Sequence, residues 1–249
     1  MDTIVCIKRV PDTETRVRFS DGATVIEPEG LKYIVSPYDE FALEAALRTT
    51  EAGEKGQVTV ITLGGEESQE TLRAALAAGA DAAVLLRGSV TMDGLSTAKA
   101  LAAELETREE RLILFGVKAG DDDQQQVGPM VATLLGRPCA TNVASFVVGE
   151  GVIRCDRDVE GGTEVVELDL PAVVTLTKGA FEPRYASLKG IMAAKRKPLE
   201  VKDADLPACR LTVERLDYPQ ERAEGRIVGE GAEAVPELVR LLRDEANVL

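Results

Sequence analysis

The residues best suited to chemistry lie in one polar loop, at 116–127. The apolar run at 111–115 before this loop predicts a buried strand, and apolar residues at helical spacing after it predict a helix from about Gln124 to Leu135. A strand, a glycine-containing loop and a helix in that order present ligands at the carboxyl end of the strand. The unpaired N–H groups at the start of the helix would favour a bound phosphate there.

Three consecutive aspartates, Asp121, Asp122 and Asp123, argue against a bare anion site in this loop. Their carboxylates could instead cap the helix and hydrogen-bond a ribose or the amine of an adenine. An acidic capping turn that binds no ligand is equally compatible with the spacing. The residues of the loop therefore leave open both a nucleotide site and a turn without a ligand.

The absence of histidine removes the commonest general base, the Ser-His and Cys-His nucleophile pairs, and histidine metal ligands. The four cysteines form no CxxC pair, and we expect buried free thiols rather than disulfides or a zinc site at Cys6, Cys139, Cys155 and Cys209. No catalytic residue and no metal ligand is assigned. The composition favours a carrier or binding protein over a bond-making enzyme.

The charge and hydropathy of the chain exclude further classes of protein. A net charge of −14 over 249 residues argues against nucleic-acid binding, because phosphate neutralisation requires a basic surface. No apolar run approaches the ~18 residues that span a bilayer. The N-terminal residues lack the basic region, apolar segment and cleavage site of a signal peptide. We expect a cytoplasmic protein that does not insert into membranes.

The elements that would position the loop alternate between strand and helix over the first ~135 residues. Ser36, Pro37 and Asp39 form a strong start signal for the first helix. This alternation predicts a mostly parallel sheet with helices on both faces. The loops after the first, second and fourth strands should meet at one edge, although GxGxxG and GxxxxGK[ST] motifs are absent. The expected strands are 3–7, 58–63, 82–86 and 111–115, and the later helices 68–78, 94–106 and 124–135.

The second half of the chain has a different pattern. Short β-rich runs predict a meander added to the same sheet, at 143–148, 152–156, 163–169 and 172–177. Residues 178–197 hold six basic residues and one acid, an inversion of the charge of the whole chain. Residues 198–233 are polar and contain three prolines, which predicts an extended arm that lies on a partner, and a last helix follows at 236–247.

Four apolar residues accompany the basic run at 178–197 and lie in a segment that we expect to be exposed. One interpretation is a solvated helix with an ordinary core face. The other is a docking segment, in which apolar side chains anchor a partner and the charges steer it. The residues in question are Tyr185, Leu188, Ile191 and Met192.

Several collinear motifs resemble the β subunit of electron transfer flavoproteins. They are KxxDDDxxxxG at 118–128, the run at 157–162 followed by Leu170–Val173, EPRYASL at 182–188 with IMAAK at 191–195, IKRVPD near the start and SPYDEFALEAA from Ser36. Each motif is modest alone, but together they cover nearly the whole chain in order.

The resemblance implies a Rossmann-like fold of the adenine nucleotide α-hydrolase type, with a β-rich extension and a C-terminal arm. It implies a structural AMP in this subunit and a larger α subunit that carries the redox-active FAD. Electrons would come from acyl-CoA dehydrogenases of fatty acid oxidation or from other flavin dehydrogenases, and would pass to a quinone reductase. The expected nucleotide-binding residues are Cys6, Ser36, Pro37, Tyr38, Asp39, Leu63, Gly116, Val117, Lys118, Ala119, Gly120, Asp121, Asp122, Asp123, Gln124, Gln125, Gln126 and Val127.

The resemblance also assigns roles in partner contacts. Leu188 matches the anchor of the family's recognition loop, with Tyr185, Ile191 and Met192 beside it. Arg157 and Asp158 match a charged pair near the subunit contact, and Tyr38 matches an aromatic residue near the FAD. The implied organisation is a nucleotide-binding domain at 1–197 and an arm with a helix at 198–249, which packs on the α subunit.

Two alternatives remain. Some family members bind a second FAD in place of AMP and bifurcate electrons; they have an Asp-Gly-Asp-Thr run, whereas this loop reads Asp-Asp-Asp-Gln at 121–124. The run at 126–129 nonetheless resembles the bifurcating type. Thr13 stands where some relatives have a tyrosine that contacts flavin. An alternative of another class is a stand-alone ATP-binding stress-type protein, but the β-rich half, basic run and tail argue against it.

Overall fold

The computed structural model describes residues 1–53, 56–88, 92–220 and 225–249. Within these residues, nine strands form one sheet in the order β11-β5-β4-β1-β6-β10-β7-β8-β9, and β2 and β3 form a separate antiparallel pair. The strands are β1 Thr3–Cys6, β2 Arg9–Pro11, β3 Tyr33–Val35, β4 Val58–Gly64, β5 Ala82–Arg87, β6 Leu112–Gly116, β7 Cys139–Val148, β8 Val152–Val159, β9 Gly162–Asp169, β10 Ala172–Leu176 and β11 Leu199–Asp203.

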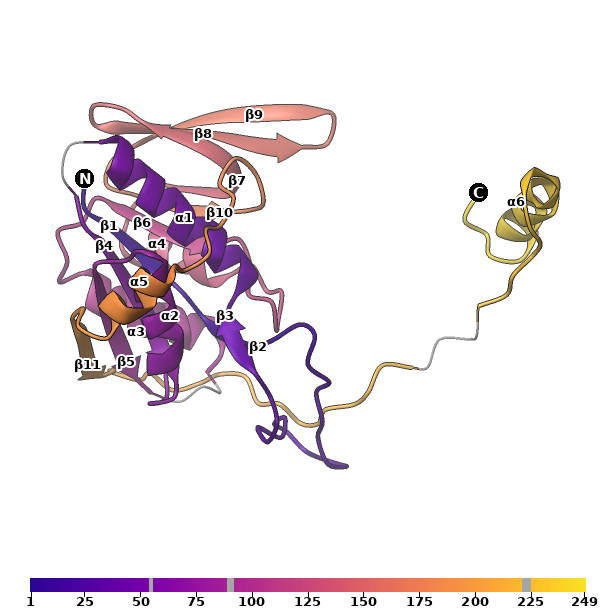
Figure 1. Cartoon of the computed structure of the whole chain (residues 1–249), viewed down its shortest axis with the longest axis horizontal. Coiled ribbons are helices and arrows are strands. Elements are labelled where there is room, and N and C mark those ends of the chain that lie inside the picture. Colours follow the sequence, from indigo (N-terminus) through magenta and orange to yellow (C-terminus); the bar gives the residue numbers. More distant parts are fainter. Residues whose placement is uncertain (54–55, 89–91, 221–224) are drawn as a thin grey trace.

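Helices cover both faces of the sheet (Figure 1). Buried residues of α1 and α2 pack with Val5, Val60 and Leu114 on one face, and those of α3 and α4 pack with Ile4 and Ile113 on the other. The predicted mostly parallel α/β architecture is therefore confirmed. The helices are α1 Pro37–Ala52, α2 Ser68–Ala78, α3 Gly94–Leu105, α4 Val127–Leu134, α5 Leu188–Ala194 and α6 Val235–Asp244, with a 3-10 turn η1 at Ala232–Ala234.

The order of the central strands creates a switch point between β1 and β6. From β1 the chain proceeds to β4 and then β5 on one side, and it returns to β6 on the other side of β1. Both neighbours pair with β1 in parallel. The loops that leave β1 and β6 therefore diverge, and a crevice opens between them at the carboxyl edge.

The β-rich half differs from a simple meander. β7, β8 and β9 are successive antiparallel strands, but β10 leaves them and inserts in parallel between β6 and β7. The reason is visible in its burial: all five residues of β10 are buried, and a central position shields both faces from water. In contrast, β9 lies at the open edge and is mostly exposed.

The polar run expected to form an arm begins with a strand. β11, at Leu199–Asp203, pairs in parallel with β5 and becomes the opposite edge of the sheet. The chain beyond it is extended up to residue 220, and residues 221–224 of the expected arm lie outside the described residues. The predicted last helix is confirmed as α6, which Figure 1 shows well away from the sheet.

Two expected helix starts differ in detail. Ser36 does precede α1, but within the described residues its hydroxyl does not cap the helix; it accepts a hydrogen bond from the Gly120 N–H at 3.2 Å. The helix expected from Gln124 begins only at Val127. Asp123 and Gln125 have positive φ of 53° and 57°, a left-handed conformation that a helix cannot contain.

We expect the central strand β6 to carry much of the stability. Leu114 is fully buried in the core beneath α1 and α2, so Leu114→Ala should lower the free energy of unfolding by about 2–5 kcal/mol. Val147 of β7 is 72% exposed, and Val147→Ala should change it by less than about 0.5 kcal/mol. Urea unfolding of both variants measures the difference; equal losses would contradict the assigned core.

Candidate nucleotide site at the switch point

A cavity of about 930 Å³ opens at the carboxyl ends of β1, β4 and β6. Its walls combine apolar side chains, including Leu63, Leu101 and Phe115, with polar groups of the 116–127 loop. Ligand sites in proteins have volumes of about 300–1,000 Å³ and this mixture of apolar walls and few polar groups. The position, the size and the lining all suit a small organic ligand with a polar end.

A buried carboxylate joins the two strands that border the crevice. Asp39, in the first turn of α1, accepts hydrogen bonds from the Lys8 N–H at 2.7 Å and from the Gly116 N–H at 2.9 Å. Lys8 follows β1 and Gly116 ends β6. One side chain thus fixes the spacing of both loops at the cavity. Burial raises the pKa of Asp39 to about 7, and the nearby Asp121 adds to this, against the two N–H groups and Lys8.

The close approach of backbone around Asp39 requires glycine at 116. A Cβ there would lie 2.5 Å from Asp39 Oδ1 and 2.6 Å from the Tyr38 carbonyl carbon. A comparable constraint holds at Gly128 in α4, where a Cβ would lie 2.6 Å from Thr175 Cγ2. Both glycines let α1 and α4 lie directly against the ends of the strands, and so they determine the shape of the cavity.

The acidic loop is largely neutralised by lysines. Lys8 Nζ lies 2.8 Å from Asp121 and 3.0 Å from Asp122, and Lys118 Nζ lies 2.7 Å from Asp123. Burial lowers the pKa of Lys8, but the two carboxylates outweigh it, so the pKa is raised and Lys8 stays charged. The aspartates do not cap α4, as one interpretation of the loop predicted, because these ion pairs hold them.

The start of α4 is open to a ligand. Gln126 occupies the N-cap position, and within the described residues its side chain makes no capping bond. Val127 and Gly128 at this end line the cavity, as do Glu67 and Ser68 at the start of α2. Unpaired N–H groups at such positions attract anions. The edge therefore offers donors for a phosphate despite the negative charge of the chain.

Thirteen of the eighteen expected nucleotide-site residues line this cavity, and the other five lie behind it or face away. Ser36 supports the loop through Gly120, Pro37 packs against Gly120, and Tyr38 lies near Lys118. Asp123 faces Lys118 and solvent. The lining residues are Cys6, Asp39, Leu63, Gly116, Val117, Lys118, Ala119, Asp121, Asp122, Gln124, Gln125, Gln126 and Val127. Burial raises the pKa of the Cys6 thiol, so it remains protonated.

The sequence did not indicate several other lining residues. Those at the starts of α2 and α3 follow strands β4 and β5, so the rule that ligands bind at carboxyl ends could have found them. Residues in the segment between β2 and β3 carry no sequence pattern that indicates a ligand site. The same is true of Leu216 in the tail, the stretch after β11. Lys8, Arg9 and Pro11 also line the cavity and belong to the loop after the first strand, which was expected at this edge. The residues missed are Ile7, Thr24, Val25, Ile26, Pro28, Leu31, Tyr33, Glu67, Ser68, Met92, Gly94, Thr97, Leu101, Phe115, Gly128 and Leu216.

The expected docking residues form a second candidate surface. Tyr185 is 99%, Leu188 79% and Met192 60% exposed, and Ile191 is exposed as well. α5 is short, starts at Ser187, whose hydroxyl accepts the Gly190 N–H, and buries only Ala194. Of the two interpretations of this segment, the solvated helix with an ordinary core face does not hold, because its apolar face points to water. Apolar side chains gathered in this way favour protein contact.

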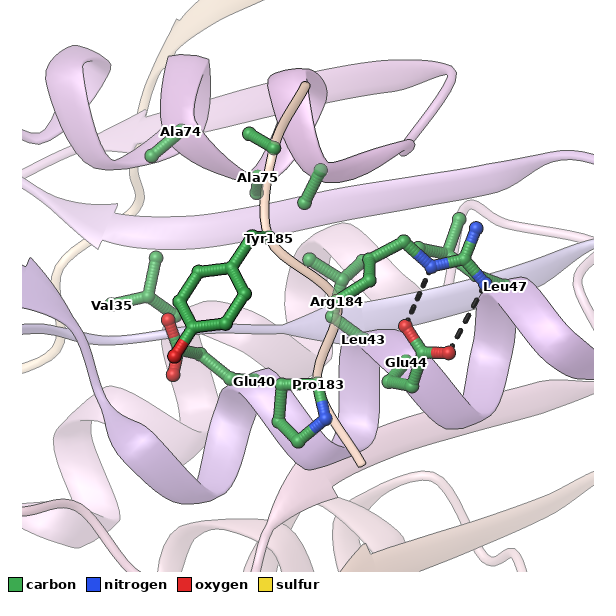
Figure 2. Close-up of a pocket in the computed structure, with 12 residues that line it drawn as sticks. Val35, Glu40, Leu43, Glu44, Leu47, Ala74, Ala75, Pro183, Arg184 and Tyr185 are labelled. Atoms are coloured by element: carbon green, nitrogen blue, oxygen red, sulfur yellow. Dashed lines mark hydrogen bonds and ion pairs between the residues drawn. The ribbon is translucent and has the colours of Figure 1, made fainter. Parts of the chain in front are cut away.

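The docking segment is fastened to the helices beneath it. Figure 2 shows Arg184 reaching across to Glu44 of α1, with Nε–Oε2 at 2.7 Å, and the same guanidinium binds Glu51 at 2.6 Å. Glu44 is buried and Arg184 is 34% exposed, so this pair is partly shielded from solvent. At the other end, Arg73 of α2 donates to the Ala194 carbonyl at 2.6 Å. The exposed apolar residues are thus held on a rigid base.

Arg157 and Asp158 lie apart from both surfaces, at the end of β8. Arg157 binds Glu164 of β9 at 2.8 Å, and Asp158 is exposed. The structure therefore separates the expected partner-contact residues into two groups, one on α5 and one on the meander. Within the described residues no cluster of three or more acidic, cysteine or histidine side chains is arranged to hold a metal ion. None of the helices described has the length and apolar character needed to cross a membrane.

The sheet order and the cavity define an α/β protein of the kind that binds ligands at a switch point. A model of the electron transfer flavoprotein domain matches residues 23–207. Over their full lengths, the chain is 40% identical to the electron transfer flavoprotein subunit beta of Bacillus subtilis (strain 168) and 37% identical to the mitochondrial one of Arabidopsis thaliana. The chain belongs to the electron transfer flavoprotein family, as a β subunit.

The buried Asp39 predicts a pH dependence of stability. Its pKa is about 7 in the folded protein against an ordinary 3.8, so from about pH 4 to 7 the folded state holds a proton that the unfolded chain has released. The contribution of Asp39 to stability therefore falls as the pH rises through this window, by at most about 1.4 kcal/mol per pH unit.

Asp39→Asn removes this titration. Urea unfolding from pH 4 to 8 should show the free energy of unfolding of the wild type falling relative to the variant up to about pH 7 and then levelling. Asp158→Asn, at an exposed carboxylate on β8, is the matched control. Its free energy of unfolding should keep the same dependence on pH as that of the wild type, because Asp39 is still present. A constant difference between wild type and Asp39→Asn across the whole range would refute the raised pKa of Asp39.

Proposed function

We propose that this chain is the β subunit of a heterodimeric electron carrier, that it holds AMP in the switch-point cavity, and that it docks dehydrogenases through α5. The observation that carries the proposal is the cavity between the ends of β1 and β6, because most residues of the predicted loop line it. In this role the chain binds the nucleotide and positions its protein partners, and it makes or breaks no covalent bond. That suits a chain without histidine, because electron transfer between flavins depends on proximity.

AMP fits the chemistry of the lining. The open start of α4 supplies N–H donors for a phosphate, and Lys8 and Lys118 keep the acidic loop from repelling it. The loop amides and carboxylates can hydrogen-bond ribose hydroxyls and adenine nitrogens. Leu63, Leu101 and Phe115 supply an apolar wall for the base. We assign the nucleotide a structural role, since the chain has no histidine to act as a general base beside it.

An α subunit completes the proposed carrier. It would hold the FAD, which accepts electrons from the dehydrogenase and releases them to a quinone reductase. Many apolar residues of the tail are exposed, among them Leu211, Ile227 and Leu238, and they suit burial against a partner. Acyl-CoA dehydrogenases and related flavin dehydrogenases are the proposed donors, with Leu188 as the anchor.

A second FAD in place of AMP remains the alternative, because a cavity of about 930 Å³ has room for a ligand larger than a mononucleotide. The crowding of the loop by Asp122 and Gln124 favours AMP. A stand-alone ATP-binding protein is the weaker candidate, because such a protein would not need the exposed apolar residues of α5 or those of the tail.

The nucleotide content of the heterodimer tests the proposal. We expect one FAD and one AMP per heterodimer when the chain is co-expressed with its α subunit, purified and denatured, and the released nucleotides are separated by chromatography. The chain purified alone should be colourless. Two FAD and no AMP would establish the bifurcating alternative, and ATP bound to the isolated chain would support the stand-alone protein.

Leu188→Ala tests the docking surface. Loss of an exposed anchor should slow reduction of the heterodimer by an acyl-CoA dehydrogenase about tenfold, while the FAD content and the subunit assembly stay unchanged. Val165→Ala removes an exposed apolar side chain from β9 and serves as the matched control. Stopped-flow flavin absorbance measures both rates. Unchanged kinetics in Leu188→Ala would rule out α5 as the docking site.

A further inference from the structure

Two segments far apart in the sequence close the mouth of the cavity together. Residues of the segment between β2 and β3, including Val25, Ile26 and Leu31, line the cavity, and so does Leu216 of the tail. In the stretch 211–220 every residue is exposed except Leu216, which is half-buried. The tail therefore turns one apolar side chain inward where it passes the cavity.

Direct contacts join the tail to the segment between β2 and β3. The Leu216 N–H donates to the Ala23 carbonyl at 2.8 Å. Two residues further on, the ring of Tyr218 stacks on that of Phe19, with centroids 4.1 Å apart and planes inclined by 19°. In extended chain, residues two apart point to the same side. Leu216 and Tyr218 thus form one contact surface against this segment.

The tail is also anchored upstream, at the start of α3. Asp93 accepts the Arg210 N–H at 2.6 Å and the Leu211 N–H at 3.2 Å, while its other oxygen caps α3 through the Ser96 N–H. The Ser96 hydroxyl donates to the Ala208 carbonyl at 3.1 Å. These bonds hold the pKa of Asp93 well below its usual range. Since Gly94 and Thr97 line the cavity, this anchor lies on one side of it.

The path of the tail is therefore fixed at two points, the start of α3 and the segment between β2 and β3, with the cavity between them. We propose that residues 208–218 form a strap that belongs to the nucleotide site and retains the nucleotide by holding the segment 19–31 over the cavity. The inference rests on the proposed nucleotide site and adds to it Phe19, Leu216 and Tyr218, which act as positioning residues. Leu216 itself supplies an apolar wall.

The ring stack provides the test. Tyr218→Ala removes the stack and leaves the core intact, because the side chain is 59% exposed. An aromatic pair of this kind corresponds to about a 2- to 12-fold change in an equilibrium or rate. We expect the bound nucleotide to leave the purified heterodimer faster by that factor, measured by timed dialysis followed by chromatography. Tyr218→Phe keeps the ring and should retain the nucleotide at the wild-type rate.

Phe19→Ala removes the other ring and should give the same loss, and the double variant should lose no more than either single one. Tyr185→Ala, at an exposed ring on the docking segment, is the control and should not change retention. A heterodimer whose wild type carries no nucleotide would overturn both the site and the strap. A nucleotide that is present but leaves Tyr218→Ala at the wild-type rate would overturn the strap alone.

Discussion

The carboxylate of Asp39 is the constraint on which the site depends. It is buried at the start of α1 and accepts one N–H from the end of β1 and one from the end of β6. The order of the strands reverses between these two parallel strands, so their loops diverge unless something ties them. A buried charge is costly, and two backbone hydrogen bonds and the nearby Lys8 offset only part of that cost, so the pKa of Asp39 is raised to about 7. This tie joins two walls of the cavity, because Lys8 and Gly116 both line it.

Around this tie the molecule keeps the cavity apart from the exposed apolar residues of α5. The cavity lies at the carboxyl edge of the sheet, whereas α5 packs on α2. The two regions share α1: its first turn carries Asp39, and its middle carries Glu44, which holds Arg184. One helix therefore positions both a wall of the cavity and the base of the docking segment. Arg184 donates to both carboxylate oxygens of Glu44, and a two-point ion pair of this kind restricts the geometry of the contact.

The charge pattern of the loop shows why the role of acidic residues is ambiguous when only neighbouring residues are considered. Three adjacent aspartates suggest either a helix cap or repulsion of a phosphate. In the folded chain Lys8 comes from the loop after β1 and pairs with two of them, and Lys118 pairs with the third. Two of the three ion pairs of the loop thus join residues more than a hundred positions apart in the sequence.

The sequence alone determined the alternation of strands and helices, because apolar periodicity and capping residues are local properties. It also determined most of the loop residues that line the cavity, since carboxyl ends of parallel strands converge wherever such a sheet forms. The start of α4 was misplaced because the left-handed residues Asp123 and Gln125 carry no glycine signal.

Only the tertiary structure decided where β10 and β11 insert, because strand order depends on pairing between distant segments. It alone brought Leu216 to the cavity and Tyr218 to Phe19, since a polar, proline-containing tail has no periodicity that reveals what it contacts.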